Sequence, residues 1–134
     1  MTISMQGKRG LIMGVANERS IAWGIAKAMA EAGGELAFTY QGEAFGKRLA
    51  PLAASVGSDF MVDVDVTNAA SMDAAFSALG ERWETIDFVV HAIAYSDKNE
   101  LTGRISDTSV ENFKNSMVIS CYSLIDVSKR AMAL

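Results

Sequence analysis

Residues 8–24 read KRGLIMGVANERSIAWG, and this stretch decides the fold. A short apolar run, residues 10–13, leads to Gly14 and a polar turn, and Ser20 and Ile21 then open an alanine-rich segment. This order predicts a buried strand, a glycine-containing turn and a helix start, where backbone N–H groups can hold a phosphate. The spacing departs from the standard dinucleotide fingerprint. The motif predicts a phosphate site mainly because it lies in the first strand–helix unit of a chain that repeats such units.

The composition indicates one globular domain. Of the 134 residues, 50% are hydrophobic, which is enough for a core. A net charge of −4 without a basic run argues against nucleic acid or an anionic membrane as a partner. A single cysteine, Cys121, fits a reducing compartment. The N-terminus has no apolar signal core, and no apolar run approaches the ~20 residues that a bilayer span needs. We therefore expect a cytoplasmic protein without a membrane segment.

Strand and helix patterns alternate along the whole chain. The expected strands are residues 10–13, 35–40, 59–64 and 86–91. The expected helices are residues 21–32, 43–55 and 69–83, and a long one that begins near Thr108. Pro51 predicts a kink or break in the second helix. Asn68 can cap the third, and Thr108 with Glu111 forms a capping box for the fourth.

Apolar residues at helical spacing predict which faces are buried. The first helix should pack on Ile21, Ile25, Ala28, Met29 and Ala32, and the last on Phe113, Met117, Cys121, Leu124 and Ser128. Cys121 is accordingly expected in the core, and most of the eight methionines are expected to serve packing. His91, at the end of a buried strand, is interpreted as structural rather than as a proton donor.

The ends of the four strands carry the functional prediction. Gly14, Gln41, Asp65 and Ala92 follow one another at intervals of 27, 24 and 27 residues, which is one strand–helix unit each. Right-handed crossovers then place all four at one edge of a parallel sheet, where ligands bind. The first end can take a pyrophosphate, the second a ribose, the third an adenine and the fourth a nicotinamide. Residues 92–106 show no period and are interpreted as a functional loop.

Five segments resemble a known family in their order and spacing: GVANERSIAWGIA, LAFTYQGE, VDVDV, DFVVHAIAY and the ISCYS of residues 119–123. The family is the NADH-dependent enoyl-acyl-carrier-protein reductases of bacterial fatty-acid synthesis, a divergent branch of the short-chain dehydrogenase/reductase superfamily. The resemblance covers essentially the whole chain. It implies an α/β fold with a Rossmann-type doubly wound parallel sheet, NADH as the cofactor, a trans-2-enoyl thioester on acyl carrier protein as the substrate, and usually a homotetramer.

The resemblance also implies roles for individual residues. It places Gly14, Ser20 and Ile21 at the pyrophosphate, Gln41 beside the adenosine, Asp65 and Val66 at the adenine, Ile93 and Ala94 along the nicotinamide ribose, and Ser96 toward the substrate. No metal is expected, because Asp63 and Asp65 have no third ligand near them in the sequence and fit a turn and an adenine contact better.

The chain departs from the family in its length. Family members are about twice as long and carry a fifth strand, followed by a helix with a catalytic Tyr, six residues and a Lys. Residues 1–134 are therefore expected to be the N-terminal part of a single dinucleotide-binding domain, with its first four βα units and without the catalytic pair, which would lie beyond Leu134. Tyr122 and Lys129 have the same spacing, but they follow the fourth strand directly, which argues against this role.

Two other functions stay open at this point. Neutral Gln41 does not decide between NADH and NADPH by charge, and Arg19 in the phosphate turn leaves NADPH open. One alternative is an NADPH-dependent short-chain ketoreductase, although Ser20-Ile21 and residues 92–94 replace the glycine-rich turn and Asn-Asn-Ala-Gly pattern of that group. The other is a non-catalytic nucleotide-binding protein of the same fold.

Overall fold

A computed structural model describes residues 3–134 and contains one parallel sheet of four strands in the order β3-β2-β1-β4. The strands are β1 (Arg9–Met13), β2 (Glu35–Tyr40), β3 (Met61–Asp63) and β4 (Phe88–His91). All three pairings are parallel. Each expected strand is confirmed, the third and fourth being shorter than expected. Because β1 lies between β2 and β4, the stretch that contains it contacts strands on both sides.

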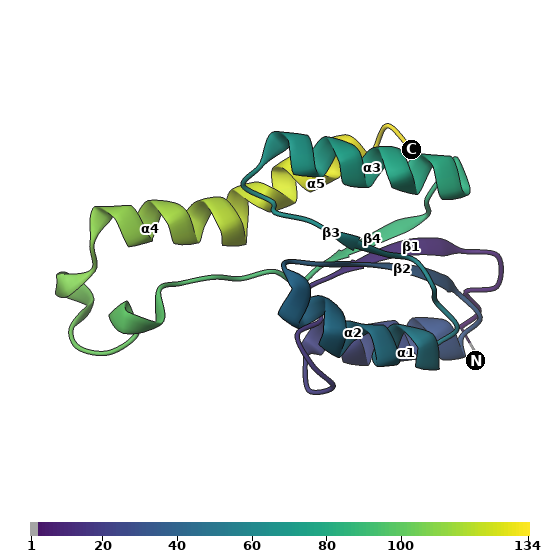
Figure 1. Cartoon of the computed structure of the whole chain (residues 1–134), viewed down its shortest axis with the longest axis horizontal. Helices are drawn as coiled ribbons and strands as arrows, with labels where there is room; N and C mark the ends of the chain where they lie inside the picture. The colour runs from purple at the N-terminus through teal and green to yellow at the C-terminus, as the bar shows by residue number, and fades with distance from the viewer. Residues whose placement is uncertain (1–2) are drawn as a thin grey trace.

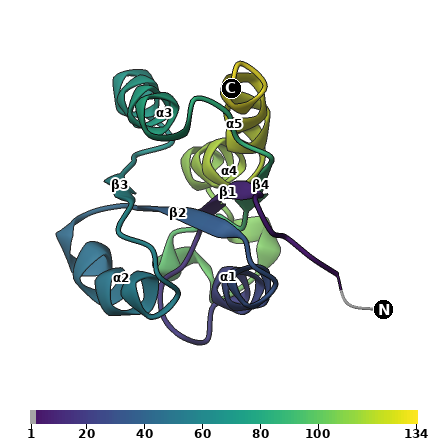
Figure 2. The same cartoon turned by 90° about the vertical axis from the view of Figure 1, so that its right-hand side faces the viewer.

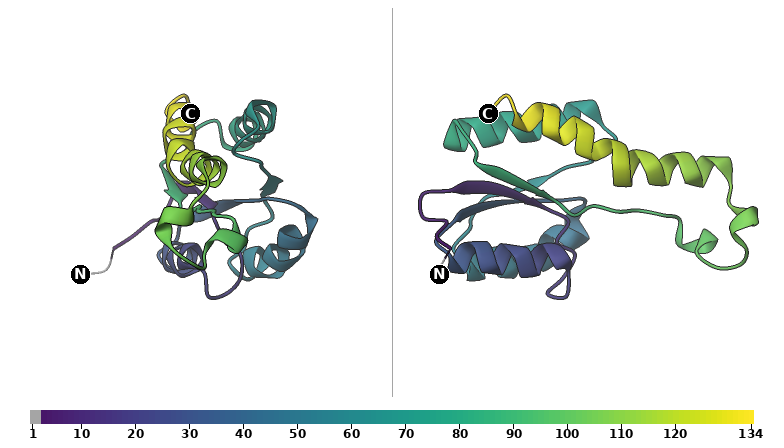
Figure 3. Two further views of the ribbon diagram at one scale, coloured as in Figure 1. Left: turned by 90° about the vertical axis from the view of Figure 1, so that its left-hand side faces the viewer. Right: turned by 180° about the vertical axis from the view of Figure 1, so that it is seen from behind.

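Helices cover both faces of the sheet. On one face lie α1 (Ile21–Glu31) and α2 (Glu43–Ser55), and on the other lie α3 (Ala69–Trp83) and α5 (Ser123–Ala131) (Figures 1 and 2). This arrangement confirms the doubly wound α/β fold. The connection after β4 and the helix α4 (Val110–Met117) extend beyond the carboxyl ends of the strands (Figures 1 and 3). Among residues 3–134, no helix combines the length and the apolar character that crossing a bilayer requires.

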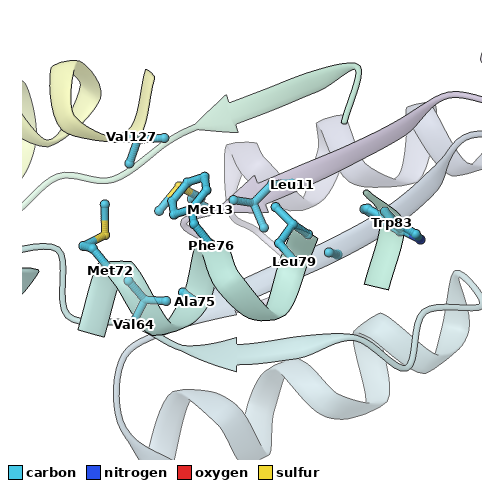
Figure 4. Packing of buried hydrophobic residues seen from close by; sticks show 10 residues of the cluster. Leu11, Met13, Val64, Met72, Ala75, Phe76, Leu79, Trp83 and Val127 are labelled. Carbon is cyan, nitrogen blue, oxygen red and sulfur yellow. The ribbon is translucent and has the colours of Figure 1, made fainter. Parts of the chain in front are cut away.

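The central strand contributes to two hydrophobic cores because its side chains alternate between the faces. Leu11 and Met13 pack with Met72, Phe76 and Leu79 of α3 (Figure 4). On the opposite face Ile12 packs with Trp23 of α1, Phe38 of β2 and Leu49 of α2. Burial on both faces accounts for the nearly continuous apolar sequence of β1.

The buried face of α1 differs from the expected one. Ile21 is 80% exposed and Ala28 is also exposed, whereas Ala22, Trp23 and Ala26 are buried. The expected stripe was therefore wrong at Ile21 and Ala28, whereas Met29 is partly buried against the core as expected. Trp23 has the largest side chain of α1 and packs against Phe38, with the ring centroids 6.5 Å apart. This contact determines which face of α1 turns toward the sheet.

Pro51 lies inside α2, which continues across it without the expected break. Leu49 and Ala53 are buried on either side of the proline and hold the helix against the sheet. Packing thus outweighs the hydrogen bond that proline cannot donate.

Caps at the other helices were predicted with mixed success. Asn68 caps α3, its side chain accepting the N–H of Ser71 at 3.1 Å as expected. The capping box of Thr108 and Glu111 was wrong, because Ser109 is the N-cap of α4 and accepts the N–H of Asn112 at 3.0 Å.

The last helix contains a π-helical segment, η3 (Val118–Tyr122), between α4 and α5. A π turn holds one more residue than an α turn and rotates the side chains that follow it. After η3 the expected stripe was therefore wrong, since Leu124 is 50% exposed and Ser128 is exposed as well. Ser123 and Val127 are buried in their place. The stripe was also wrong at Phe113, which precedes η3 and is 60% exposed, and at Cys121 within η3, which is exposed.

Candidate functional site

A cavity of about 250 Å³ lies at the carboxyl edge of the sheet. Its lining includes residues that follow all four strands. Five of the predicted site residues lie in it: Gly14, Gln41, Val66, Ile93 and Ala94. The structure thus brings together segments from residue 14 to residue 94, as the spacing of the strand ends predicted. The ligand role of each residue stays a prediction.

The backbone geometry at position 14, in the lining of the cavity, requires glycine. Its φ of +109° is disfavoured for any residue with a side chain, and a Cβ at this position would overlap the carbonyl oxygen of Ala92. The turn after β1 and the end of β4 therefore lie too close together for a side chain at Gly14. Both Gly14 and Ala92 line the cavity.

Ser20 shapes the turn before α1. Its Oγ accepts the N–H groups of Ala16 and Asn17 at 2.9 and 3.1 Å, and it does not cap the helix. Neither Ser20 nor Ile21 lines the cavity. With its hydroxyl committed to the turn, Ser20 leaves the positive end of α1 uncapped by any side chain in the described part of the chain, which suits an anion.

The two aspartates near the third strand hold loops. Asp63 Oδ1 accepts the N–H of Gly42 at 3.0 Å and fixes the turn after Gln41. Asp65 Oδ1 accepts the N–H and hydroxyl of Thr67 at 2.9 and 2.6 Å. Asp65 is half-buried beside Val66 but does not line the cavity. Within residues 3–134, no group of three or more His, Cys, Asp or Glu side chains is arranged to hold a metal ion.

Ser96 lies outside the cavity and is tied to α4. Its Oγ accepts the Nδ2–H of Asn112 at 3.1 Å, while Oδ1 of the same amide accepts the N–H of Asp97 at 2.9 Å. Its expected place toward the substrate therefore stays a prediction. Asn112 holds two residues of the connection after β4 through one side chain.

The cavity also contains residues that sequence reasoning missed. Tyr40, Phe45, Tyr95 and Ile119 line it, the last of them from η3. Phe45 lies in the first turn of α2, four residues after Gln41, and Tyr95 belongs to the quoted DFVVHAIAY segment, so the sequence could have indicated both. Ile119 was not, because no strand end or glycine turn marks its position.

His91 connects β4 to α5. The Ser123 hydroxyl donates to the carbonyl oxygen of Ile119 at 2.5 Å, so its oxygen accepts the Nε2–H of His91 at 2.7 Å. Ser123 is 1% exposed. This buried contact supports the structural interpretation of His91.

Two groups with shifted pKa values do not line the cavity. The backbone N–H of Arg9 and the ammonium of Lys8 lower the pKa of Asp87, at the amino end of β4. The Asp73 carboxylate, helped by Asp126, raises the pKa of Arg130 on α5. These charges contribute to the fold rather than to the chemistry of the cavity.

A parallel sheet with helices on both faces, a cavity at its carboxyl edge and an uncapped helix N-terminus beside β1 together define the class of dinucleotide-binding α/β proteins. Residues 14–134 match the family model described as enoyl-(acyl carrier protein) reductase. The chain belongs to this family, which confirms the resemblance found in the sequence.

Individual relatives agree. Enoyl-acyl-carrier-protein reductase (NADH) 2 of Rhizobium meliloti is 62% identical over 130 residues, covering 97% of this chain and 48% of that protein. The crystal structure of FabI from Candidatus Liberibacter asiaticus is 57% identical with a TM-score of 0.97, covering 100% of this chain and 52% of that one. The Anaplasma phagocytophilum reductase, solved in complex with NAD, is 53% identical with a TM-score of 0.91, covering 98% and 51%. The chain thus spans about half the length of the relatives it matches.

Proposed function

We propose that this chain supplies the cofactor-binding half of an NADH-dependent enoyl-acyl-carrier-protein reductase. The full-length protein would reduce trans-2-enoyl-acyl-carrier-protein to acyl-acyl-carrier-protein in bacterial fatty-acid elongation. The observation that carries this proposal is the cavity at the carboxyl edge of the sheet, which Gly14, Gln41, Val66, Ile93 and Ala94 line together.

The residues fit a dinucleotide along this edge. The strand order places the end of β1 in the middle, β2 and β3 to one side and β4 to the other. Gly14 and the start of α1, with Ser20 and Ile21, would hold the pyrophosphate. Gln41, Asp65 and Val66 would hold the adenosine, and Ile93 and Ala94 would lie along the nicotinamide ribose. The bound cofactor would supply a hydride, and these residues would bind and orient it.

NADH is the cofactor that the relatives' names support. The Rhizobium meliloti and Aquifex aeolicus proteins are named as NADH enzymes, whereas a Bacillus cereus reductase of 38% identity was solved with NADP⁺. Gln41 offers no positive charge to a 2′-phosphate, which favours NADH. Arg19 is the counter-argument.

The remaining chemistry needs residues outside this chain. Negative charge that develops on the thioester oxygen must be stabilised by a donor in the site. Tyr122 is 56% exposed and does not line the cavity, so it is a poor candidate for this donor. The family resemblance assigns the role to a Tyr–Lys pair on a later helix. A homotetrameric assembly, an acyl-carrier-protein partner and a cytoplasmic location belong to the same proposal and rest on that resemblance.

The test is an assay of the full-length protein with a trans-2-enoyl thioester and with a 3-ketoacyl thioester, each with NADH and with NADPH. We expect NADH oxidation with the enoyl substrate. Turnover of the ketoacyl substrate alone would identify a ketoreductase. Tight NADH binding without turnover of either substrate would identify a nucleotide-binding protein instead.

A further inference from the structure

The Ser120 hydroxyl contacts both backbone polar groups of Tyr95. Its oxygen accepts the Tyr95 N–H at 2.9 Å, and its hydrogen is within reach of the Tyr95 carbonyl oxygen at 3.3 Å. These residues are separated by 25 positions in the sequence. A single side chain on the last helix thus serves both backbone groups of one loop residue.

The π-helical segment η3 makes this contact together with a second one. Ser120 lies within η3, and the hydroxyl of Ser123, the next residue after η3, receives the N–H of His91. His91 ends β4, and Tyr95 follows four residues later. The two serines therefore hold both ends of residues 92–94, which line the cavity.

The two contacts differ in what they secure. The His91 contact joins a strand to a buried serine and belongs to the core, since Ser123 is 1% exposed. The Ser120 contact holds a loop residue that is 47% exposed and has no strand partner. Loops without ladder hydrogen bonds open most readily. Among the described residues, Ser120 supplies the side-chain hydrogen bonds to the loop Ile93–Tyr95, while Asn112 holds Ser96 and Asp97 after it.

We propose that Ser120 is a positioning residue that holds the loop Ile93–Tyr95 in the conformation that receives the nicotinamide half of the cofactor. This inference rests on the proposed function and deepens it. Ser120 does not line the cavity, so it acts through the backbone of Tyr95. A loop fixed before binding loses less conformational entropy when the ligand arrives, which raises affinity.

The strand order makes the effect local. The loop follows β4, whereas the segments proposed to hold the adenosine follow β2 and β3, on the other side of β1. Loosening the loop should therefore weaken the binding of NADH. It should not weaken the binding of ADP, because ADP has no nicotinamide. This difference separates positioning from a general loss of structure.

The experiment uses the full-length protein with Ser120→Ala and Ser120→Thr. Ser128→Ala, at an exposed serine of α5, is the matched control. We expect Ser120→Ala to raise the Kd for NADH about tenfold, the loss of affinity expected when one or two backbone hydrogen bonds are removed. ADP affinity should change less than about twofold, and Ser120→Thr, which keeps the hydroxyl, should restore NADH binding. In the cofactor-free protein, amide hydrogen exchange at residues 93–96 should be faster in Ser120→Ala than in Ser128→Ala.

Equal NADH affinity of Ser120→Ala and the unmodified protein would overturn the inference, as would parallel losses of NADH and ADP. If Ser120→Ala fails to fold, Ser120→Cys, with its weaker donor and acceptor, is taken through the same titrations and the same criteria. The unmodified protein decides the proposed function separately. If it binds NADH, a failed prediction for Ser120 leaves that function standing.

Discussion

The Cα of Gly14 faces the carbonyl oxygen of Ala92 at a distance that leaves no space for a Cβ. Two strand ends that are far apart in the sequence therefore touch backbone to backbone. Both residues line the cavity, so its shape depends on the absence of a side chain at Gly14.

Gly14→Ala should lower both the stability of the protein and its affinity for NADH. The φ of +109° alone should cost about 1–3 kcal/mol in the free energy of unfolding, and the overlap with Ala92 adds to this. Urea unfolding and NADH titration of the full-length protein measure the two effects. Gly24→Ala is the control, because a Cβ there meets open space; it should stabilise α1 by about 0.5–1 kcal/mol. A neutral Gly14→Ala would show that the two strand ends can separate without cost.

Asp65→Ala should raise the Kd for NADH while leaving kcat unchanged, because the proposed contact serves binding alone. Losing a hydrogen bond to a charged acceptor costs about 1.5–3 kcal/mol, which is about tenfold or more in affinity. The same carboxylate holds Thr67, so Thr67→Val is the matched variant that loosens the turn and keeps the charge. If Thr67→Val costs as much as Asp65→Ala, the turn rather than a ligand contact explains the loss.

Asp87 should make stability depend on pH in the acid range. Its folded pKa lies below the ordinary value of 3.8, so the unfolded chain binds more protons there. The contribution of Asp87 is therefore fully present above that value and is lost as the pH falls through the lower, folded pKa. In Asp87→Asn the melting temperature should fall less steeply on acidification. Lys8→Met, which leaves the Arg9 N–H in place, should give an intermediate slope; unchanged slopes in both variants would remove Asp87 from the acid response.

The full-length protein should bind NADH more tightly than NADPH. Gln41 at the end of β2 is neutral and lines the cavity, and no Lys or Arg adjoins it in the sequence. Competition titrations of both cofactors measure the difference. In Arg19→Gln the preference should widen if Arg19 helps to hold the 2′-phosphate of NADPH. A preference for NADPH in the unmodified protein would contradict the prediction.

A polypeptide consisting of residues 1–134 alone should not reduce an enoyl thioester and should associate. Within the described residues β4 pairs only with β1, and the last helices expose Phe113, Tyr122, Leu124 and Ile125. Light scattering and the enoyl-thioester assay test both parts. A monomeric, active polypeptide would return Tyr122 and Lys129 to the list of catalytic candidates.

Local sequence signals sufficed for the sheet and for part of the site. The apolar run before Gly14 predicts a strand buried on both faces, and the regular spacing of Gly14, Gln41, Asp65 and Ala92 predicts their shared edge. Both signals depend on short-range chemistry, namely side-chain alternation and turn formation. The cap at Asn68 was predictable for the same reason.

The errors fall where distant residues decide the local structure. Ser109 rather than Thr108 is the N-cap of α4, and the Glu100 carboxylate accepts both the N–H and the hydroxyl of Ser109. The rotation of α1 depends on the contact between Trp23 and Phe38. No local sequence pattern encodes such pairings. In the last helix, the apolar residues follow the period of a continuous α-helix, because hydrophobic periodicity does not reveal the extra residue of a π turn.

Because of the extra residue in its π turn, η3 should tolerate the deletion of a residue poorly. Deleting one residue between Val118 and Tyr122 would restore a continuous α-helix and turn all later side chains by about 100°. Ser123 and Val127 would then rotate out of the core, and a deletion before Ser120 would also move its hydroxyl away from Tyr95. Deleting a residue from the exposed connection at 101–104 shortens a segment without regular hydrogen bonding. Insertions and deletions in the natural variation of this segment should therefore gather in the connection and avoid η3.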